Sequence, residues 1–340
     1  MIIKTTASAP HLADFTLSPH VASNYNCDEL CPMVNRPTAS SQFTIFENYL
    51  VRSMLYHSHP EGVVMRVAVT GAAGLIGGVV FERLQSDGHQ VVGIDRPLGE
   101  WLAAGRNTDD KDAPSRVQHH FDLADASDDD WQMMLQDCEV VVHLAADANP
   151  SNSDESMMRN NVQLTRNLMR NSLNSGVRRV ILSSSGLTQV GLESELIQGG
   201  KLEGQLIGVK HGTSTTSTYG ESKVFVEKIG EKYSCENNMQ CIVVRIGTVI
   251  PNESEHWERG GRLQATAFLQ TDVSEFFSCA VVADFSTWDP RTCQGHPVVP
   301  NFLLTSAQSD SPGRFIDLEP GISALGWTPI DWPNNSANLQ

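Results

Sequence analysis

Tyr219 and Lys223 have the types and spacing of a proton-transfer pair. Residues four positions apart on a helix share a face, so the two side chains are expected to lie together. A free tyrosine has a pKa of about 10 and is a poor base at neutral pH. A neighbouring ammonium group favours the phenolate, so we predict a lowered pKa for Tyr219, which could then accept a proton from a substrate alcohol.

A row of hydroxyl side chains, Ser183, Ser184 and Ser185, ends the strand predicted to begin at Val177. Ser185 is expected to hydrogen-bond the substrate oxygen beside the tyrosine, and Ser184 is a second candidate for substrate contact. The alternative is that the Tyr–Lys spacing arose by chance at a partly exposed helix start with a solvated lysine.

Three glycines, Gly71, Gly74 and Gly77, mark the join between a predicted strand and a predicted helix. Gly71 allows a tight turn, Gly74 leaves bare backbone for a diphosphate, and Gly77 lets the helix lie close to the strand. The helix N-terminus adds free N–H groups and a partial positive charge. The stretch therefore predicts a dinucleotide-binding turn, with an ordinary βαβ unit and incidental glycines as the alternative.

An acid, Asp95, ends the next predicted strand, where dinucleotide-binding folds place the residue that holds the adenosine ribose. Its carboxylate would accept hydrogen bonds from the free diol of NAD and repel the 2′-phosphate of NADP. We therefore expect NAD as the cofactor. Arg96 follows directly and could pair with a phosphate, which leaves NADP as the alternative.

Strands and helices alternate from residue 66 to residue 247, which predicts an α/β fold with a doubly wound parallel sheet. Ligands of such sheets bind beyond the carboxyl ends of the strands. Residues 187–217 show little periodicity and are expected to form an active-site loop. The other expected elements are strands over Arg116–Asp122, Glu139–Ala146, Gln240–Gly247 and Val298–Thr305, and helices over 129–135, 154–175, 219–232, 262–282 and 315–326.

Further candidates lie at the ends of these strands. Asp122, with Leu123, could hydrogen-bond an adenine amine, although Asp122 could equally cap a helix from Ala124 onward. His143 lies inside an apolar strand and is expected to be a satisfied core residue. The small side chains that end this strand would let a cofactor approach the backbone. The remaining cofactor candidates are Leu75, Ile76, Leu144, Ala145, Ala146 and Ile246.

The composition argues against several classes of protein. The net charge of −16 makes nucleic-acid and acidic-membrane partners unexpected. No apolar run approaches the roughly 20 residues that span a bilayer. The seven cysteines form no metal-type pair, so we expect reduced thiols, no metal and a cytoplasmic location.

Four segments are expected. Residues 1–64 are polar and aperiodic, and are interpreted as a disordered extension, with Met65 as an alternative true start and a targeting segment as a further option. Residues 65–260 are expected to form the NAD-binding Rossmann domain. A small substrate-binding lobe is expected over 261–331, followed by a tail over 332–340.

Several motifs resemble the extended short-chain dehydrogenase/reductase superfamily, and within it the NAD-dependent epimerase/dehydratase family. The motifs are TGAAGLIG (70–77), HLAA (143–146), SSS (183–185), YGESK (219–223) and RIG (245–247). The resemblance covers residues 65–331. It implies that Ser185, Tyr219 and Lys223 are the catalytic triad, that Lys223 and Tyr219 also contact the cofactor, and that Asn161 stabilises the active-site helix beside it.

The RIG motif, the segment from Arg262 and the ending Leu325–Asp331 are similar to uronate dehydrogenase-like sugar dehydrogenases. This similarity implies hydride transfer between NAD and a small hydroxylated substrate, a sugar or sugar acid. Arg262 would bind the acid's carboxylate through its bidentate fork, with Thr248 as a further contact; the alternative for Arg262 is a surface helix arginine. Those enzymes have Asn-His after the serine, where this chain has Gly186 and Leu187.

Two other functions remain open. A nucleotide-sugar epimerase or dehydratase would use the same cofactor, but it needs a larger carboxyl-terminal lobe than the 93 residues after residue 247 provide. A non-catalytic NAD-binding sensor would not require the Ser185, Tyr219 and Lys223 set. The expected partner is a small-molecule substrate, and a homodimer is allowed for.

Overall fold

The computed structural model describes residues 63–97, 112–193, 206–250, 261–284, 301–330 and 332. All of them belong to His59–Gln340, the second of the two units of the chain. The extension expected before Met65 lies almost wholly outside the described residues, as does most of the tail expected over 332–340.

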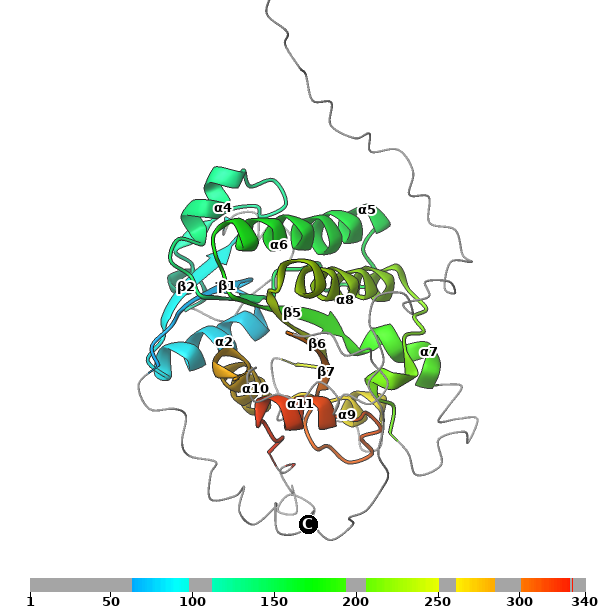
Figure 1. Cartoon of the computed structure of the whole chain (residues 1–340). Coiled ribbons are helices and arrows are strands. Elements are labelled where there is room, and N and C mark those ends of the chain that lie inside the picture. Colours follow the sequence, from blue (N-terminus) through cyan, green and yellow to red (C-terminus); the bar gives the residue numbers. More distant parts are fainter. Residues whose placement is uncertain are drawn as a thin grey trace, which may run out of the picture. The chain divides into compact units, whose positions relative to one another are not determined.

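The described core is a sheet of seven parallel strands in the order β3-β2-β1-β4-β5-β6-β7 (Figure 1). The order reverses between β1 and β4, which pair from Val67–Val140 to Thr70–His143. The parallel strands and this reversal of their order confirm the predicted fold class, a doubly wound sheet. Such a sheet binds its ligand at the reversal. The strands are β1 Arg66–Thr70, β2 Gln90–Asp95, β3 His119–His120, β4 Val140–His143, β5 Arg179–Ser185, β6 Gln240–Ile246 and β7 Phe302–Ala307.

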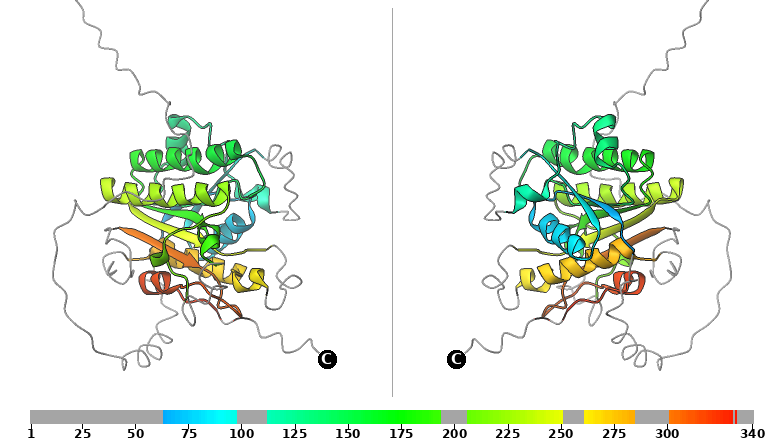
Figure 2. Two further views of the ribbon diagram at one scale, coloured as in Figure 1. Left: turned by 90° about the vertical axis from the view of Figure 1, so that its right-hand side faces the viewer. Right: turned by 90° about the vertical axis from the view of Figure 1, so that its left-hand side faces the viewer.

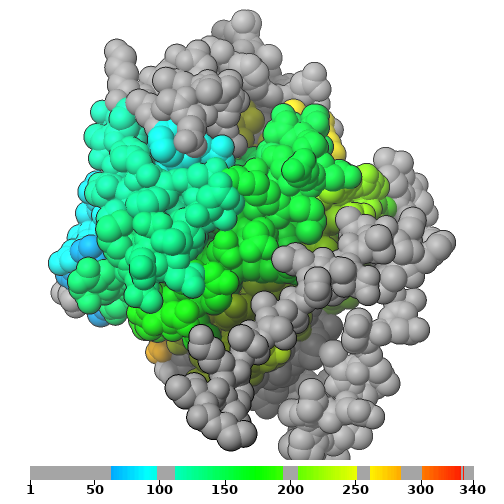
Figure 3. All heavy atoms as spheres, turned by 90° about the horizontal axis from the view of Figure 1, so that it is seen from above, coloured from blue at the N-terminus to red at the C-terminus, as the bar shows by residue number. Residues whose placement is uncertain are grey.

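Helices cover both faces of the sheet (Figures 1 and 2). One face carries α2 Leu75–Ser86, α10 Gln270–Val282 and α11 Glu319–Leu325. The other carries α4 Asp128–Met134, α6 Leu164–Asn174 and α8 Thr218–Asn237. Figure 3 looks down on this second side, where the segments around α4 and α6 form much of the outer surface.

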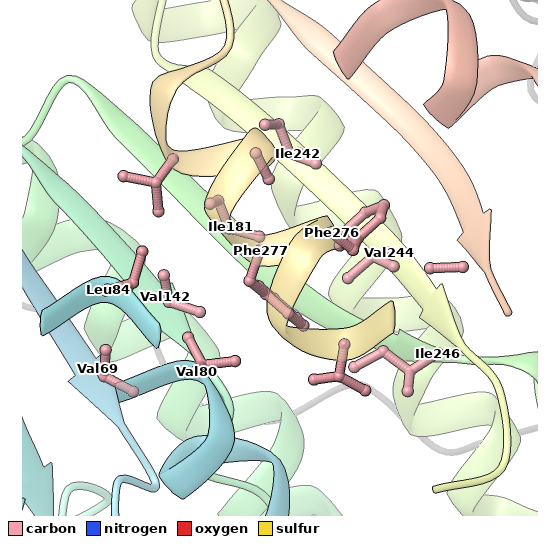
Figure 4. Packing of buried hydrophobic residues seen from close by; sticks show 14 of the residues in the cluster. Val69, Val80, Leu84, Val142, Ile181, Ile242, Val244, Ile246, Phe276 and Phe277 are labelled. Carbon is pink, nitrogen blue, oxygen red and sulfur yellow. The ribbon is translucent and has the colours of Figure 1, made fainter. Parts of the chain in front are cut away.

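A cluster of aromatic and aliphatic side chains joins α2 and α10 to the sheet (Figure 4). Phe276 and Phe277 of α10 lie over strand residues such as Ile181 and Val244. Phe276 also meets the Trp327 ring edge to face, with ring centroids 5.1 Å apart. This burial fixes α2, and with it the turn that precedes α2, against the strand ends.

Residues 154–175 do not form the single α-helix that was predicted. The segment begins as α5 Asp154–Met157, passes through a π-helical turn, η2 Met158–Gln163, and continues as α6. A π turn adds one residue to the helical repeat and is frequent at functional sites. The side chain of Asn161, within this turn, is 1% exposed.

The helix predicted over 262–282 is also divided. A short helix, α9 Arg262–Ala265, is followed by non-helical backbone before α10 begins. The intervening carbonyl of Thr266 accepts the Thr248 N–H at 2.7 Å, and the Leu269 N–H donates to Ser309 Oγ at 2.9 Å. These bonds replace the helical ones, so the chain bends toward the strand ends.

Two other segments differ from the sequence prediction. The strand expected from Arg116 to Asp122 is reduced to β3, and its first expected residue, Arg116, instead ends a 3₁₀ helix, η1 Ala113–Arg116, that contains Pro114. The described parts of the expected loop contain short helical turns: η3 Gly186–Gln189, α7 Val190–Leu192 and η5 Val209–His211. Within the expected carboxyl-terminal lobe, β7 pairs with β6 as part of the main sheet.

Replacing Phe276 by Ala should lower the free energy of unfolding by about 3–5 kcal/mol, because it removes a fully buried ring and leaves a cavity. Urea unfolding followed by circular dichroism measures this change. Met133→Ala on α4, where the side chain is 48% exposed, should change it by less than about 0.5 kcal/mol. A loss below about 1 kcal/mol at Phe276 would contradict the packing described for α10.

Candidate active site

A pocket of about 400 Å³ lies at the carboxyl edge of the sheet. Segments that are far apart in the sequence meet in its wall: the glycine turn, residues at or just after the ends of five strands, β2 to β6, and the first two turns of α8. The residues of its wall are Gly71, Gly74–Gly77, Asp95, Arg96, Phe121–Leu123, Leu144–Ala146, Ala148, Asn160, Leu164, Ser183–Ser185, Tyr219, Lys223 and Ile246–Val249.

The glycine turn brings bare backbone to this pocket. Gly71 has a φ of +75°, which side chains disfavour, and its N–H donates to the Ile94 carbonyl at 2.8 Å. A Cβ atom on Gly77 would lie 1.9 Å from the Gly71 carbonyl oxygen, so α2 packs directly on the turn. Gly74 is the N-cap of α2 and provides no capping side chain. The turn thus suits a diphosphate, because no side chain stands between it and the first N–H groups of the helix.

Asp95 and Arg96 lie side by side in the pocket wall, at the end of β2. The Asp95 carboxylate accepts the Ala73 N–H at 3.0 Å and the Arg96 N–H at 2.8 Å. These bonds tie the acid to the glycine turn, on the side of the pocket where an adenosine ribose is expected.

Asp122 and Leu123 also line the pocket. Asp122 does accept the N–H of Ala124, at 3.1 Å, but the bond closes a turn and does not start a helix. The helix begins later, at Asp128, where Ser127 is the N-cap. The predicted helix cap at Asp122 is therefore wrong, and its other oxygen accepts a charged hydrogen bond from Arg159 at 2.9 Å.

Tyr219 and Lys223 lie near the start of α8, which Ser217 caps by accepting the Gly220 N–H. Both side chains are almost fully buried, and the lysine Nζ is 5.8 Å from the centroid of the tyrosine ring. Lys223 Nζ donates to the Ser183 carbonyl at 3.0 Å. The structure thus brings the predicted pair together, with Ser185 in the same pocket wall.

The pKa of Tyr219 moves in the direction opposite to our prediction. Burial raises it, the hydrogen bond with Ser185 opposes that rise, and the charge of Asp147 adds to it. Burial also lowers the pKa of Lys223 to about 8, against the influence of Asp147. The predicted lowering of the Tyr219 pKa rested on nearby positive charge alone, whereas taking a phenolate out of water costs free energy and raises that pKa.

Two candidates have their polar groups engaged within the protein. The Ser184 hydroxyl, although in the pocket wall, donates to Glu227 at 2.7 Å. Arg262 forms a bidentate pair with Glu193, with N–O distances of 2.6 and 2.7 Å. Arg262 is not among the described residues of the pocket wall. The Arg262 guanidinium, which was expected to bind the carboxylate of a substrate, therefore binds the carboxylate of Glu193 in this structure.

Asn161 lies behind the pocket wall, and the neighbouring Asn160 is the residue that lines it. The Asn161 side-chain oxygen accepts the Asp147 N–H at 2.7 Å, and its amide nitrogen donates to Ser222 on α8 at 3.0 Å. It therefore links the segment after β4 to the helix of Tyr219. In the described structure this linking contact is direct.

His143 is a satisfied core residue, as predicted. It is 2% exposed, and its ring nitrogens lie 2.8 Å from Thr70 Oγ1 and 3.3 Å from Thr165 Oγ1. Burial lowers its pKa to about 3, and the charge of Lys223 adds to this shift. The ring is therefore neutral at physiological pH and holds the ends of β1 and β4 together.

Several groups at the site are not predicted by any of the sequence motifs. Asp147 acts on both Tyr219 and Lys223, and its position directly after the HLAA strand was a usable signal. Phe121 and Val249 line the pocket without any motif to indicate them. Within the described ranges, no cluster of three or more His, Cys, Asp or Glu residues could hold a metal ion, and no helix has the length and apolarity of a membrane span.

The sequence model of the NAD-dependent epimerase/dehydratase family matches residues 67–269. The chain belongs to this family. Membership makes it an NAD-dependent enzyme of the extended short-chain dehydrogenase/reductase type, and it confirms the resemblance found in the motifs. The match extends from the glycine turn through Tyr219 and Lys223 to the bend before α10.

Similar proteins with named activities match about four fifths of this chain and most of their own length. L-arabinose 1-dehydrogenase (NAD(P)(+)) of Haloferax volcanii is 29% identical over 81% of this chain and 98% of its own. NAD-dependent glucose-6-phosphate dehydrogenase of the same organism is 24% identical over 80% and 95%. Glucuronic acid dehydrogenase from Chromohalobacter salexigens superposes with a TM-score of 0.58 at 21% identity, over 79% of this chain and 85% of its own, which supports the shared fold.

Gly77→Ala should weaken NAD binding at least about tenfold, because the new Cβ would overlap the Gly71 carbonyl and push α2 away from the turn. Calorimetric titration with NAD measures this affinity. Gly186→Ala is the matched control, since its Cβ would meet its nearest neighbour, the Ile246 carbonyl oxygen, at an ordinary 3.7 Å. Equal affinities for all three proteins would contradict the close approach at Gly77.

His143→Gln should reduce the acid sensitivity of folding. The pKa of His143 is about 3 when folded and about 6.5 when unfolded, so its contribution to stability is lost as pH falls through that window. Between pH 6.5 and 5 the loss is about 2 kcal/mol. Urea unfolding at both pH values should show a smaller loss in the variant than in wild type. The exposed His120, changed to Gln, should behave as wild type; an unchanged pH slope in His143→Gln would contradict this account.

Proposed function

We propose that this enzyme is an NAD-dependent dehydrogenase that transfers a hydride between a small hydroxylated substrate, a sugar or sugar acid, and NAD. The observation that carries the proposal is that Ser185, Tyr219 and Lys223 share one pocket wall with the glycine turn. The arabinose and glucose-6-phosphate dehydrogenases among its relatives support sugar oxidation as the reaction class.

In this proposal the phenolate form of Tyr219 accepts the proton of the substrate alcohol and becomes the neutral phenol. NAD, when bound, supplies the hydride acceptor. Ser185 donates a hydrogen bond to the substrate oxygen and orients it toward the phenol. The hydrogen bond with Ser185 opposes the rise in the Tyr219 pKa that burial causes. Lys223, whose Nζ lies 5.8 Å from the centroid of the tyrosine ring, would add a positive charge near the phenol.

The remaining wall residues, together with Asn161 behind the wall and Arg262 outside it, would hold the cofactor and the substrate. The glycine turn would receive the diphosphate, and Asp95 the adenosine ribose, with Arg96 beside it. The wider proposed cofactor set comprises Leu75, Ile76, Asp122, Leu123, Leu144, Ala145, Ala146, Asn161, Tyr219, Lys223 and Ile246. The proposed substrate contacts are Ser184, Ser185, Thr248 and Arg262.

A sugar acid places a particular demand on this site. Its carboxylate would have to displace Glu193 from Arg262, because the two residues already form a bidentate pair. A neutral sugar makes no such demand. We also propose a cytoplasmic location, a homodimeric assembly and segment boundaries at residues 260 and 331.

A second candidate is a nucleotide-sugar epimerase of the same family. UDP-glucose 4-epimerase of Mycolicibacterium smegmatis is 37% identical over 127 residues, 36% of this chain and 39% of its own. An epimerase would form product without net NADH and would retain its cofactor through purification. The two activities therefore separate in one absorbance assay at 340 nm.

Tyr219→Phe should lower the rate of NAD reduction by at least about a hundredfold while NAD affinity changes little, because the variant loses only the proton acceptor. The assay uses a panel of sugars, sugar acids and sugar phosphates, with NADH formation as the readout and calorimetry for NAD binding. Tyr233→Phe, lower on the same helix, is the matched control and should retain full activity. Full activity in Tyr219→Phe would remove the mechanism.

A further inference from the structure

Asp147 is a buried acid between two alanines that line the pocket. It is 7% exposed, and its carboxylate accepts hydrogen bonds from several groups. The Asn149 N–H donates to it at 3.1 Å, the Asn152 side-chain amide contacts both oxygens at 2.9 Å, and the Ser156 hydroxyl also donates. Hydrogen bonds to the charged form favour ionisation, so Asp147 is a fixed negative charge behind the pocket wall.

A chain of buried hydrogen bonds fixes this acid relative to α8. Asn161 binds the backbone of Asp147 twice: its oxygen accepts the N–H at 2.7 Å and its nitrogen donates to the carbonyl at 3.1 Å. The same nitrogen donates to Ser222 Oγ at 3.0 Å, which in turn donates to the Tyr219 carbonyl at 2.7 Å. Ser222 directly precedes Lys223, so the acid and the lysine belong to one rigid arrangement.

Lys223 needs a negative charge nearby. Its side chain is almost completely buried, and its nitrogen donates to the Ser183 carbonyl, which carries no formal charge. Burying an unpaired ammonium group is costly, and the usual result is loss of its proton. Burial does lower the pKa of Lys223 to about 8, and Asp147 acts against this shift while raising the pKa of Tyr219.

We propose that Asp147 is a positioning residue that supplies the buried counter-charge of Lys223 and thereby sets the pH range in which the Tyr219–Lys223 pair works. The consequence of this counter-charge for catalysis rests on the proposed dehydrogenase function. The coupling between the charges of Asp147 and Lys223 is a property of the folded chain and does not depend on that function. Removing the negative charge should shift the titration of both partners to lower pH, because a carboxylate stabilises the protonated form of each.

Other charged groups on the elements packed against α8 are paired, neutral or turned toward solvent. Glu227 forms a buried ion pair with Arg245 at 2.7 Å, and His143 is neutral above about pH 3. Arg159 pairs with Asp122 at 2.9 Å and with Asp125 at 2.6 Å. The remaining charged residues near this end of α8 all lie exposed on the surface: Asp154, Glu155, Arg166, Arg170, which also pairs with Asp128, and Glu221.

The test replaces Asp147 by Asn and follows Lys223 directly. Protein with ¹³Cε-labelled lysine is titrated by NMR, and Lys223→Arg identifies the Lys223 signal. In Asp147→Asn this signal should titrate at a pH lower than in wild type by on the order of one unit. The pH profile of kcat/KM for NAD reduction should move in the same direction.

Two controls separate charge from structure. Ser156→Ala removes a hydrogen bond to the same carboxylate but keeps its charge, and Asp154→Asn makes the same chemical change at an exposed site on the next helix. Both should titrate as wild type. The proposal is overturned if Asp147→Asn leaves the Lys223 signal unchanged, or if Ser156→Ala shifts it as far.

A reciprocal experiment covers the case in which Asp147→Asn does not fold. In Lys223→Met the ¹³Cγ signal of Asp147 should titrate at a higher pH than in wild type, because coupling between two charges acts equally on both. No change there would overturn the proposal. Coupling without NAD reduction by any substrate would support this inference and refute the proposed function, whereas NAD reduction without coupling would do the reverse.

Discussion

The contact between the first turn of α2 and the end of β1 is the constraint on which the rest of the site depends. A Cβ atom at residue 77 would lie 1.9 Å from the Gly71 carbonyl, and one at Gly71 would lie 2.8 Å from the Ala145 nitrogen. Strand, turn, helix and the end of β4 therefore meet with only backbone between them. This close approach places uncapped helix N–H groups beside the carboxyl ends of the strands, where the polar side chains gather.

Burial sets the chemistry of the other half of the pocket. Tyr219 and Lys223 are almost fully buried, and burial favours the neutral form of each. It raises the pKa of Tyr219 and lowers the pKa of Lys223 to about 8. Two groups modify these shifts. The hydrogen bond with Ser185 opposes the rise in the Tyr219 pKa, and the charge of Asp147 adds to that rise while opposing the fall in the Lys223 pKa. Asn161, which lies in the π turn, connects Asp147 to α8 through its hydrogen bonds to the Asp147 backbone and to Ser222.

The sequence was sufficient for the sheet and for most of the pocket wall, because those features follow from local patterns such as the glycine spacing and the apolar strands. The five-residue interval between the buried Met157 and Val162 was a signal for the π turn, but a continuous helix was the simpler interpretation. The bend after Ala265 depends on bonds to Thr248 and Ser309, which no local pattern encodes. Local patterns likewise do not encode which side chains that are distant in the sequence pair in the fold.

The ion pair of Arg262 with Glu193 and the direction of the Tyr219 pKa shift are further examples of long-range effects. The first joins residues 69 positions apart, and the second depends on how completely the fold excludes water. Neither charge pattern nor motif spacing carries that information. A sequence can nominate the residues of a site from their types, but their ionisation depends on packing that only the fold determines.

The most direct test of the central claim is a crystal structure of the protein with NAD bound. The account predicts the diphosphate within hydrogen-bond distance of the backbone N–H groups of Leu75 and Ile76, and the nicotinamide ring beside Tyr219, close enough for the hydroxyl to reach an alcohol placed against the ring. A diphosphate bound away from the glycine turn, or a nicotinamide ring separated from the Tyr219 hydroxyl by the pocket wall, would contradict it.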